Sequence, residues 1–351
     1  MKILVLNAGS SSLKYKLFVN QRLSLEGLIE NITDYHQGIV AVEKRLQEVG
    51  IERLSSLDVV GHRVVHGGEV FRESVVIDPN VIATIRALIP LAPLHNPANL
   101  EGIVMIAHVA PQLKQVAVFD TAFHQTLPPK AYRYALPQEL YQRDAIRRYG
   151  FHGTSHQFVA QEASRQLGQP LHETNLITLH LGNGASLCAI KNGESVDTSM
   201  GFTPLEGLIM GTRSGDIDPT ILFYLSQEHG YTLDQLNTLL NRESGLLGIC
   251  GQNDMRQIHA MVEAGHADAT LALEMFVYRI KKYIGAYYAI LGRVDALVFT
   301  GGIGENDEVT RALILEGLPF ELPHLVIETD EELAIALEAK RRIEELKTAT
   351  P

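Results

Sequence analysis

Three apolar stretches of this sequence each run directly into a turn of glycine and other small residues. The stretches cover residues 2–7, 176–181 and 295–300, and their turns contain Gly9, then Gly182 and Gly184, then Gly301, Gly302 and Gly304. Small residues let backbone N–H groups approach an anion closely, and oriented amides bind phosphate. One such turn would be an ordinary tight turn. Three of them, each at the carboxyl end of a predicted strand, favour a nucleotide-binding α/β protein.

The first two of these stretches are followed by returning strands. Residues 13–19 alternate between the two faces of an antiparallel strand, with Leu13, Tyr15 and Leu17 on one face. The segments LVLNAGSSSLKYKLF and ITLHLGNGASLCAI therefore share a strand, a small-residue turn and a returning strand. We interpret this likeness as an internal duplication, with one copy in each of two domains.

Helices alternate with strands along the rest of the chain. Helical patterns cover residues 79–91, 97–109, 154–167, 267–291 and 331–346, and a buried strand is predicted at 115–120. In the longest helix, the residues that follow helical spacing are Leu271, Met275, Tyr278 and Lys282. In the last helix, the apolar members are Leu333, Ile335, Ala336, Ile343 and Leu346. Alternating helices and strands predict an α/β fold.

The composition narrows the class of protein. With 351 residues, 46% of them hydrophobic, the chain is long enough for two domains. A net charge of -11 argues against a nucleic-acid-binding surface. Cys188 and Cys250 form no C-x-x-C pair, so neither a disulfide framework nor a zinc site is predicted. The amino terminus has too short an apolar run for a signal peptide, and charges such as Arg279, Lys281 and Lys282 interrupt the most apolar stretches, so we expect a cytoplasmic protein.

Several familiar motifs are missing. No glycine turn matches G-x-x-x-x-G-K-[ST] or a strand-to-helix G-x-G-x-x-G, which excludes a Walker-type NTPase and a dinucleotide-binding protein. A Ser/His/Asp hydrolase is disfavoured because no G-x-S-x-G elbow is present. Histidines are dense beside turns but lack metal-ligand spacing; they are His62, His66, His95, His124, His152, His156 and His180.

Two arginines stand among glycines and small residues rather than among surface charges. Arg63 lies in GHRVVHGG and Arg213 in GTRSGD. A planar guanidinium suits a bidentate grip on a carboxylate or on a phosphoryl group. The alternative is a structural ion pair with Glu69 or Asp216, and for either arginine alone both interpretations stay open.

Three further polar residues have unusual positions. Lys14, on the first hairpin, is either an exposed strand lysine or a group that neutralises a phosphate. His152 lies between two glycines just before a helix, where a core histidine is not expected. Asp120 ends a buried strand, so its carboxylate is either a helix N-cap or a ligand to Mg²⁺ or its water.

Long runs of these residues resemble one family, the acetate kinases, over almost the whole chain. The runs are NAGSSSLK, GHRVVHGGE, PLHNPAN, FDTAFH, GFHGTSH, HLGNGAS, MGFTPLEGLIMGTRSGD and GGIGEN. They coincide with the family in sequence, order and spacing. One departure is that the connection from Phe18 to Asp58 is shorter than is usual in the family, so part of the first domain's small sheet is expected to be reduced.

The resemblance implies a fold and an activity. The fold is two duplicated ribonuclease H-like, actin-like ATPase domains around a nucleotide cleft, in a homodimer. The N-terminal domain would comprise residues 1–122 plus 331–351, and the second, nucleotide-binding domain residues 123–330. The activity is reversible transfer of the γ-phosphoryl group of ATP to acetate, giving acetyl phosphate and ADP. The implied metal is Mg²⁺, with Mn²⁺ as an alternative, and the partners are small molecules rather than nucleic acid or membrane.

The resemblance also assigns residues. The metal is associated with Asn7 and Glu331. The nucleotide would contact Ser10, Ser12, Lys14, His180, Leu181, Gly182, Asn183, Gly184, Asp254, Met255, Arg256, Gly301, Gly302, Ile303, Gly304 and Glu305. The acid would contact Arg63, Val65, Leu94, His95, Phe151 and Pro204. The catalytic residues would be Arg63, Asp120, His152 and Arg213, with His152 and Arg213 as transition-state stabilisers and Asp120 as acid/base.

The chemistry suggests a different interpretation of Asp120. A carboxylic acid substrate is already ionised at neutral pH and needs no strong base, so we expect Asp120 to orient Mg²⁺ or its water. Two alternatives to acetate kinase stay open on sequence. One is a propionate or butyrate kinase with a roomier pocket. The other is a non-enzymatic actin- or Hsp70-like nucleotide switch, which would have no use for Arg63 and Arg213.

Overall fold

The computed structural model describes residues 1–32 and 34–349, which divide into two compact units. Unit 1 comprises Met1–Gln125, Gly153–Phe158 and the described part of Asp330–Pro351, and unit 2 comprises Thr126–His152 and Val159–Thr329. The domain boundaries expected from the sequence, at 122/123 and 330/331, stay a prediction about independently folding domains.

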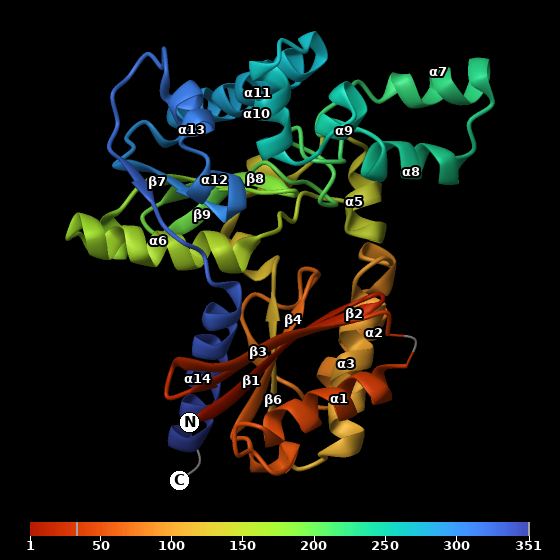
Figure 1. Ribbon diagram of the computed structural model, residues 1–351, viewed down its shortest axis with the longest axis vertical. Coiled ribbons are helices and arrows are strands. Elements are labelled where there is room, and N and C mark those ends of the chain that lie inside the picture. Colours follow the sequence, from red (N-terminus) through yellow and green to blue (C-terminus); the bar gives the residue numbers. More distant parts are fainter. Residues whose placement is uncertain (33, 350–351) are drawn as a thin grey trace. The chain divides into compact units, whose positions relative to one another are not determined.

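Unit 1 is built on a six-stranded mixed sheet in the order β3-β2-β1-β4-β6-β5 (Figure 1). Its strands are β1 (Lys2–Gly9), β2 (Ser12–Val19), β3 (Arg22–Glu30), β4 (Val59–Val64), β5 (Val75–Val76) and β6 (Gln115–Phe119). The first three are antiparallel neighbours, whereas β4 runs parallel to β1 and β6 parallel to β4. Its helices are α1 (Tyr35–Gln47), α2 (Pro79–Ala87), α3 (Asn96–Val109) and α14 (Glu331–Ala349).

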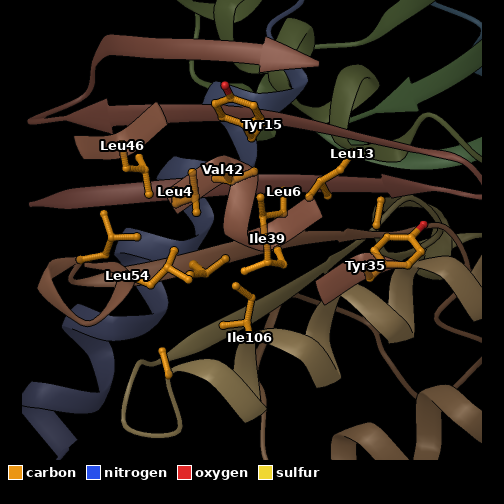
Figure 2. Close-up of a cluster of buried hydrophobic side chains, with 14 of the residues drawn as sticks. Leu4, Leu6, Leu13, Tyr15, Tyr35, Ile39, Val42, Leu46, Leu54 and Ile106 are labelled. Atoms are coloured by element: carbon orange, nitrogen blue, oxygen red, sulfur yellow. The ribbon is translucent and has the colours of Figure 1, made fainter. Parts of the chain in front are cut away.

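Both faces of β1 are covered, which explains why this strand is almost continuously apolar. On one face, Leu4 and Leu6 of β1 pack with Ile39 of α1 and Ile106 of α3 (Figure 2). On the other face, Ile3 and Val5 pack against α14, whose buried members include Ile335, Ala339 and Ile343. Alternate β1 residues thus point to opposite helical layers. Leu346, expected among the apolar members of this helix, is instead 42% exposed, because α14 continues past the edge of the buried cluster.

Unit 2 repeats the plan with a five-stranded sheet in the order β11-β10-β7-β8-β9. Its strands are β7 (Leu176–Leu181), β8 (Ala185–Lys191), β9 (Glu194–Thr198), β10 (Ala296–Thr300) and β11 (His324–Val326). The helices are α4 (Pro129–Tyr132), α5 (Gln138–Asp144), α7 (Thr220–His229), α8 (Leu233–Arg242), α9 (Gly245–Cys250), α10 (Met255–Glu263), α11 (Ala267–Leu291), α12 (Gly301–Asn306) and α13 (Glu308–Leu315). Helix α6 (Gly153–Leu167) has residues in both units. The 3₁₀ helices of the chain are Leu54–Ser56, Ile89–Leu91, Ala122–Thr126 and Leu171–Glu173.

The two sheets share their topology, which confirms the predicted duplication. In each, three strands joined by hairpins are antiparallel neighbours, and two further strands add in parallel beside the first strand. The hairpins β1–β2 and β7–β8 are the two segments whose sequences are alike. The fold is therefore the expected α/β arrangement of two duplicated actin-like domains.

Helix α11 confirms the predicted span, 267–291. The stripe expected from helical spacing is solvent-exposed, with Leu271 at 49% and Tyr278 at 66% exposure. The buried face instead carries Phe276, Ile280 and Ile284. Apolar residues occur on both sides of this helix, so periodicity alone could not choose between them.

The connection from Phe18 to Asp58 contains two elements that the sequence analysis left unassigned. Strand β3 extends the small sheet, and α1 covers the cluster around Leu4 and Leu6. Asp34 is the N-cap of α1, where its side chain accepts a hydrogen bond from the N–H of His36.

Candidate active site

In unit 1, Arg63 and Asp120 meet at the carboxyl ends of two parallel strands. β4 and β6 pair so that Arg63 lies opposite Val118, and Asp120 follows β6 directly. Nε of Arg63 donates to Oδ1 of Asp120 at 2.9 Å, and its Nη2 donates to Oδ2 at 2.7 Å. Asp120 is only 4% exposed, so this bidentate pair is largely shielded from water.

A second carboxylate approaches the same guanidinium. Oε2 of Glu331, at the start of α14, lies 3.5 Å from Nη1 of Arg63. Burial raises the pKa of Asp120 and the charge of Glu331 adds to this, whereas Arg63 opposes it. Burial works against the charge of Arg63, but Asp120 and Glu331 more than offset it and raise the pKa of the guanidinium. The partners of Arg63 are therefore these two carboxylates, and the Glu69 alternative is not needed.

Two lysines of the first hairpin bind the acidic start of α14. The ammonium of Lys14 lies 2.5 Å from Oε1 of Glu332, although half of its side chain is exposed. Lys16, two residues on, is mostly buried and lies 3.2 Å from Glu332 and 3.3 Å from Asp330. Sequence reasoning missed Lys16 and Glu332. The signal was the spacing of two between the lysines, which places both on one face of β2, together with three successive acidic residues at a helix start.

The other residues predicted for the site in unit 1 include several of the β1–β2 hairpin. Asn7 is in register with Lys14 across the β1–β2 hairpin. At the turn, a Cβ on Gly9 would come within 2.9 Å of Oγ of Ser12, while Ser10 is exposed. Asn99, which was not singled out, ties the site together, because its Oδ1 accepts from the N–H of Val65 and its Nδ2 donates to the carbonyl of Ala8.

Leu94 and His95 immediately precede α3. Leu94 is 56% exposed, so it offers apolar surface rather than core packing. His95 is the N-cap position of α3, and its electrostatic effect lowers the pKa of Asp120. A partly buried Val65 and an exposed Leu94 are compatible with a small apolar pocket, which stays a prediction.

In unit 2, His152 has an unusual backbone and two polar neighbours. It adopts a left-handed conformation (φ 55°) at the start of α6, which is uncommon for a non-glycine residue. Its Nδ1 lies 2.9 Å from Oγ of Ser186, and its ring stacks on His180 with centroids 4.2 Å apart. A Cβ added to Gly184 would lie 3.6 Å from both Nε2 of His152 and Nη1 of Arg213, so these two cationic or donor groups flank the same turn.

Arg213 of unit 2 is partly buried, and its guanidinium bonds a backbone carbonyl. Its Nη1 donates to the carbonyl of Pro204 at 3.0 Å and contacts Sδ of Met210 at 3.7 Å. Within residues 1–32 and 34–349, no carboxylate forms an ion pair with Arg213, and burial lowers its pKa. The ion pair with Asp216 that the sequence left open is not formed, because Tyr283 and Gly207 bind that carboxylate.

The two glycine turns of unit 2 are neighbours. A Cβ on Gly182 would be 4.0 Å from the backbone N of Gly302. Gly301 has a φ of +77°, and a Cβ there would lie 2.8 Å from the carbonyl of Leu181, so glycine is needed on both grounds. Oε1 of Glu305 accepts from the N–H groups of Gly301 and Thr329, at 2.8 and 2.9 Å. The side chain of Glu305 therefore holds the backbone at Gly301 and at Thr329, the residue just before the last segment of unit 1.

Three residues predicted to contact the nucleotide have side chains that are either buried or highly exposed, and their role stays a prediction. Leu181 and Met255 are buried in the core of unit 2, so only their backbone could meet a ligand. Arg256 is 91% exposed and pairs with Asp254 at 2.6 Å. Of the remaining predicted residues of this group, Asn183 lies in the turn after β7, whereas Ile303 and Gly304 lie in helix α12, where the sequence had predicted a turn. For the acid, Phe151 is buried and Pro204 is the acceptor for Arg213.

Neither a metal-binding cluster nor a membrane-spanning helix is found among the described residues. Over the part of the chain that the structure describes, no three His, Cys, Asp or Glu side chains form a group that could hold a metal ion. Within the same residues, no helix is both long and apolar enough to cross a membrane.

Comparisons with known proteins identify the family. The model of the acetokinase family matches residues 2–343. The chain is 54% identical over 343 residues to the acetate kinase of Sulfurovum sp. (strain NBC37-1), covering 91% of this chain and 87% of that protein. It superimposes on the crystal structure of Porphyromonas gingivalis acetate kinase with a TM-score of 0.91 at 42% identity, covering 97% and 99% of the two chains. A propionate kinase from Francisella tularensis subsp. tularensis SCHU S4 superimposes with a TM-score of 0.92 at 41% identity, again covering 97% and 99%. With this match and with the paired arginine, histidine and glycine-turn geometry, the chain belongs to the acetokinase family.

Proposed function

We propose that this protein is an acetate kinase, which reversibly transfers the γ-phosphoryl group of ATP to acetate. The observation that carries the proposal is a partly buried guanidinium, Arg213, without a carboxylate partner among the described residues and adjacent to His152 and Gly184. A partly buried cation that is not neutralised internally is suited to an anionic ligand. Family membership identifies the class of ligand, and the glycine turns offer amides for its phosphates.

The proposed step is a direct in-line displacement. An oxygen of acetate attacks the γ-phosphorus, the new O–P bond forms, and the bond to the β,γ-bridging oxygen breaks as ADP leaves with the electron pair. Acetate is ionised at neutral pH, so no proton has to be removed. The main barrier is repulsion between the two anions, which positioned cations reduce. In our proposal Arg63 binds the acid, while Arg213 and His152 stabilise the equatorial oxygens of the phosphoryl group in flight.

The donor set of unit 1 fits a magnesium ion. Mg²⁺ in such sites is bound by one or two carboxylates together with phosphate oxygens and water, so a cage of three protein carboxylates is not required. Asp120 and Glu331 present two carboxylates around Arg63, and Asn7 contributes an amide. When bound, the ion would neutralise phosphate charge. We propose that Asn7 and Glu331 hold it and that Asp120 orients its water rather than accepting a proton, with Mn²⁺ as an alternative ion.

The test of this function is trapping of the acyl phosphate with hydroxylamine, in reactions that contain Mg-ATP and acetate, propionate or butyrate. We expect acetyl hydroxamate to form fastest and ADP release to depend on the acid. ATP turnover without any acid would instead favour a nucleotide switch. Faster reaction with propionate or butyrate would identify the alternative substrate that the propionate kinase neighbour represents.

Val65 is proposed to limit the size of the acid. Val65 is partly exposed, its backbone N–H donates to Asn99, and it follows Arg63 by two residues. Replacing Val65 with alanine should shift the ratio of kcat/KM for propionate over acetate upward by about 10-fold, because one methylene in an apolar pocket is worth ~1–3 kcal/mol. The measurement is the pair of kcat/KM values for each enzyme. An unchanged ratio would remove Val65 from the pocket.

We further propose a cytoplasmic homodimer. Helices α7 and α8 support this, since α7 buries no residue and α8 buries only Leu236. Phe223 is 65% exposed and Leu233 84% exposed, and short helices with so little packing need a partner surface. Sedimentation velocity that showed only monomer at micromolar concentration would refute the dimer.

A further inference from the structure

The loop that carries Arg213 is closed at its base by one carboxylate. Oδ1 of Asp216 accepts from the N–H of Gly207 at 2.8 Å, and the N–H of Asp216 donates to the carbonyl of Gly207 at 3.0 Å. Gly207 has a φ of +109°, and a Cβ there would meet the carbonyl of Ser199 at 2.5 Å. The two ends of the loop are therefore held together at a position where only glycine fits.

Helix α11 holds this base from outside the loop. The hydroxyl of Tyr283 donates to Oδ2 of Asp216 at 2.7 Å, and Nη1 of Arg279 donates to the carbonyl of Gly207 at 3.0 Å. Burial raises the pKa of Tyr283, and the charge of Asp216 raises it further. The phenol therefore remains a hydrogen-bond donor throughout the neutral range.

Asp216 is only three residues from Arg213 in sequence, yet the two do not pair. Both carboxylate oxygens are engaged: Oδ1 accepts from the Gly207 amide, and Oδ2 accepts from the Tyr283 hydroxyl and lies 3.8 Å from Nη1 of Arg279. The guanidinium of Arg213 extends instead to the carbonyl of Pro204 and lies beside Gly184. An aspartate with a free oxygen so near in sequence would compete for this cation, because a charge-assisted pair is stronger than a bond to a backbone carbonyl.

We propose that Tyr283 is a positioning residue that holds Asp216 away from Arg213, so that the guanidinium stays available for the phosphoryl group. The inference rests on the proposed role of Arg213 in phosphoryl transfer. Tyr283 would then act entirely through Asp216. Removing its hydroxyl should lower kcat, and removing the charge of Asp216 as well should raise kcat again.

The test compares Tyr283→Phe, Asp216→Asn and the double variant by their kcat for acetyl phosphate formation. Tyr283→Phe should lower kcat on the order of tenfold, since Oδ2 of Asp216 would lose its only short hydrogen bond among the described residues and keep only the 3.8 Å ion pair with Arg279. Asparagine keeps an oxygen for the Gly207 amide but cannot form an ion pair with Arg213. The double variant should therefore recover several-fold relative to Tyr283→Phe, a coupling expected only for groups that act on each other.

Tyr287→Phe is the matched control on the same helix. The hydroxyl of Tyr287 is buried and has no hydrogen-bond partner in the described part of the chain, so its removal should leave kcat unchanged. A double variant slower than both single variants would show that Tyr283 only braces the loop, and wild-type kcat in Tyr283→Phe would equally overturn the proposal. If the wild-type enzyme itself formed no acetyl phosphate, the proposed function would fall, and this inference with it.

Discussion

Arg213→Ala is expected to lower kcat for acetyl phosphate formation on the order of 10³-fold or more, with little change in thermal stability. The large kinetic effect follows from losing a cation that stabilises the phosphoryl group only as charge develops. The small effect on stability follows from the contacts of Arg213, which are a backbone carbonyl and a thioether. Its removal leaves no buried carboxylate without a partner. Steady-state kinetics and a thermal melt of the same sample measure both effects.

The matched control for Arg213 is Arg143→Ala. Arg143 is 71% exposed and pairs only with the adjacent Asp144 among the described residues, so its loss should leave kcat unchanged. A residual rate for Arg213→Ala within tenfold of wild type would exclude this arginine as a transition-state group. A large drop in melting temperature would show that it is mainly structural.

Arg63→Ala, unlike Arg213→Ala, is expected to have a large effect on stability. It should destabilise unit 1 by about 3–5 kcal/mol as well as abolish acid binding. The cause is that the Asp120 carboxylate, 4% exposed, would lose both of its guanidinium hydrogen bonds, and Glu331 would lose its nearby cation. Urea denaturation of wild type and variant measures the difference.

The same variant should show a characteristic dependence on pH. Burial already raises the pKa of Asp120 in the folded protein, and removing Arg63 removes the influence that lowers it. A carboxyl whose folded pKa exceeds its unfolded value of about 3.9 costs stability as pH rises between the two values. The deficit of Arg63→Ala relative to wild type should therefore be smaller at acidic pH than at neutral pH. Arg63→Ala/Asp120→Asn, which removes the unpaired charge, should recover part of the loss, and a deficit independent of pH would argue against this account.

The local features of the fold could be predicted from the sequence because their causes are local. Alternation along the strands and the small-residue turns specify the hairpins β1–β2 and β7–β8. Residues predicted to bind phosphate lie in and beside these turns. The position of Asp120 beside Arg63 was also accessible in principle. Both residues lie at the carboxyl ends of apolar strands, and parallel neighbours place such ends together.

What the sequence could not supply is the choice among long-range partners. Asp216 appears well placed to pair with Arg213, but its partner Tyr283 is 67 residues away. Lys16 could be taken for an exposed strand residue, yet it binds Asp330, which is 314 residues later. The buried face of α11 could not be chosen from spacing for a related reason, since the contacts that bury Phe276 and Ile280 come from other elements. Tertiary packing decided these cases, and short-range spacing carries no information about it.

The central proposal is that Arg63 and Arg213 both act in the transfer step, Arg63 on the acid and Arg213 on the phosphoryl group. A double-mutant cycle on kcat for acetyl phosphate formation, with Arg63→Lys, Arg213→Lys and both together, tests it most directly, because lysine keeps the charge beside Asp120 and removes the planar, bidentate grip. We predict a coupling of about 1 kcal/mol or more, so that the double variant is clearly faster than the product of the single effects requires. Additivity within about 0.5 kcal/mol would contradict the claim, since it is the behaviour of groups that act independently.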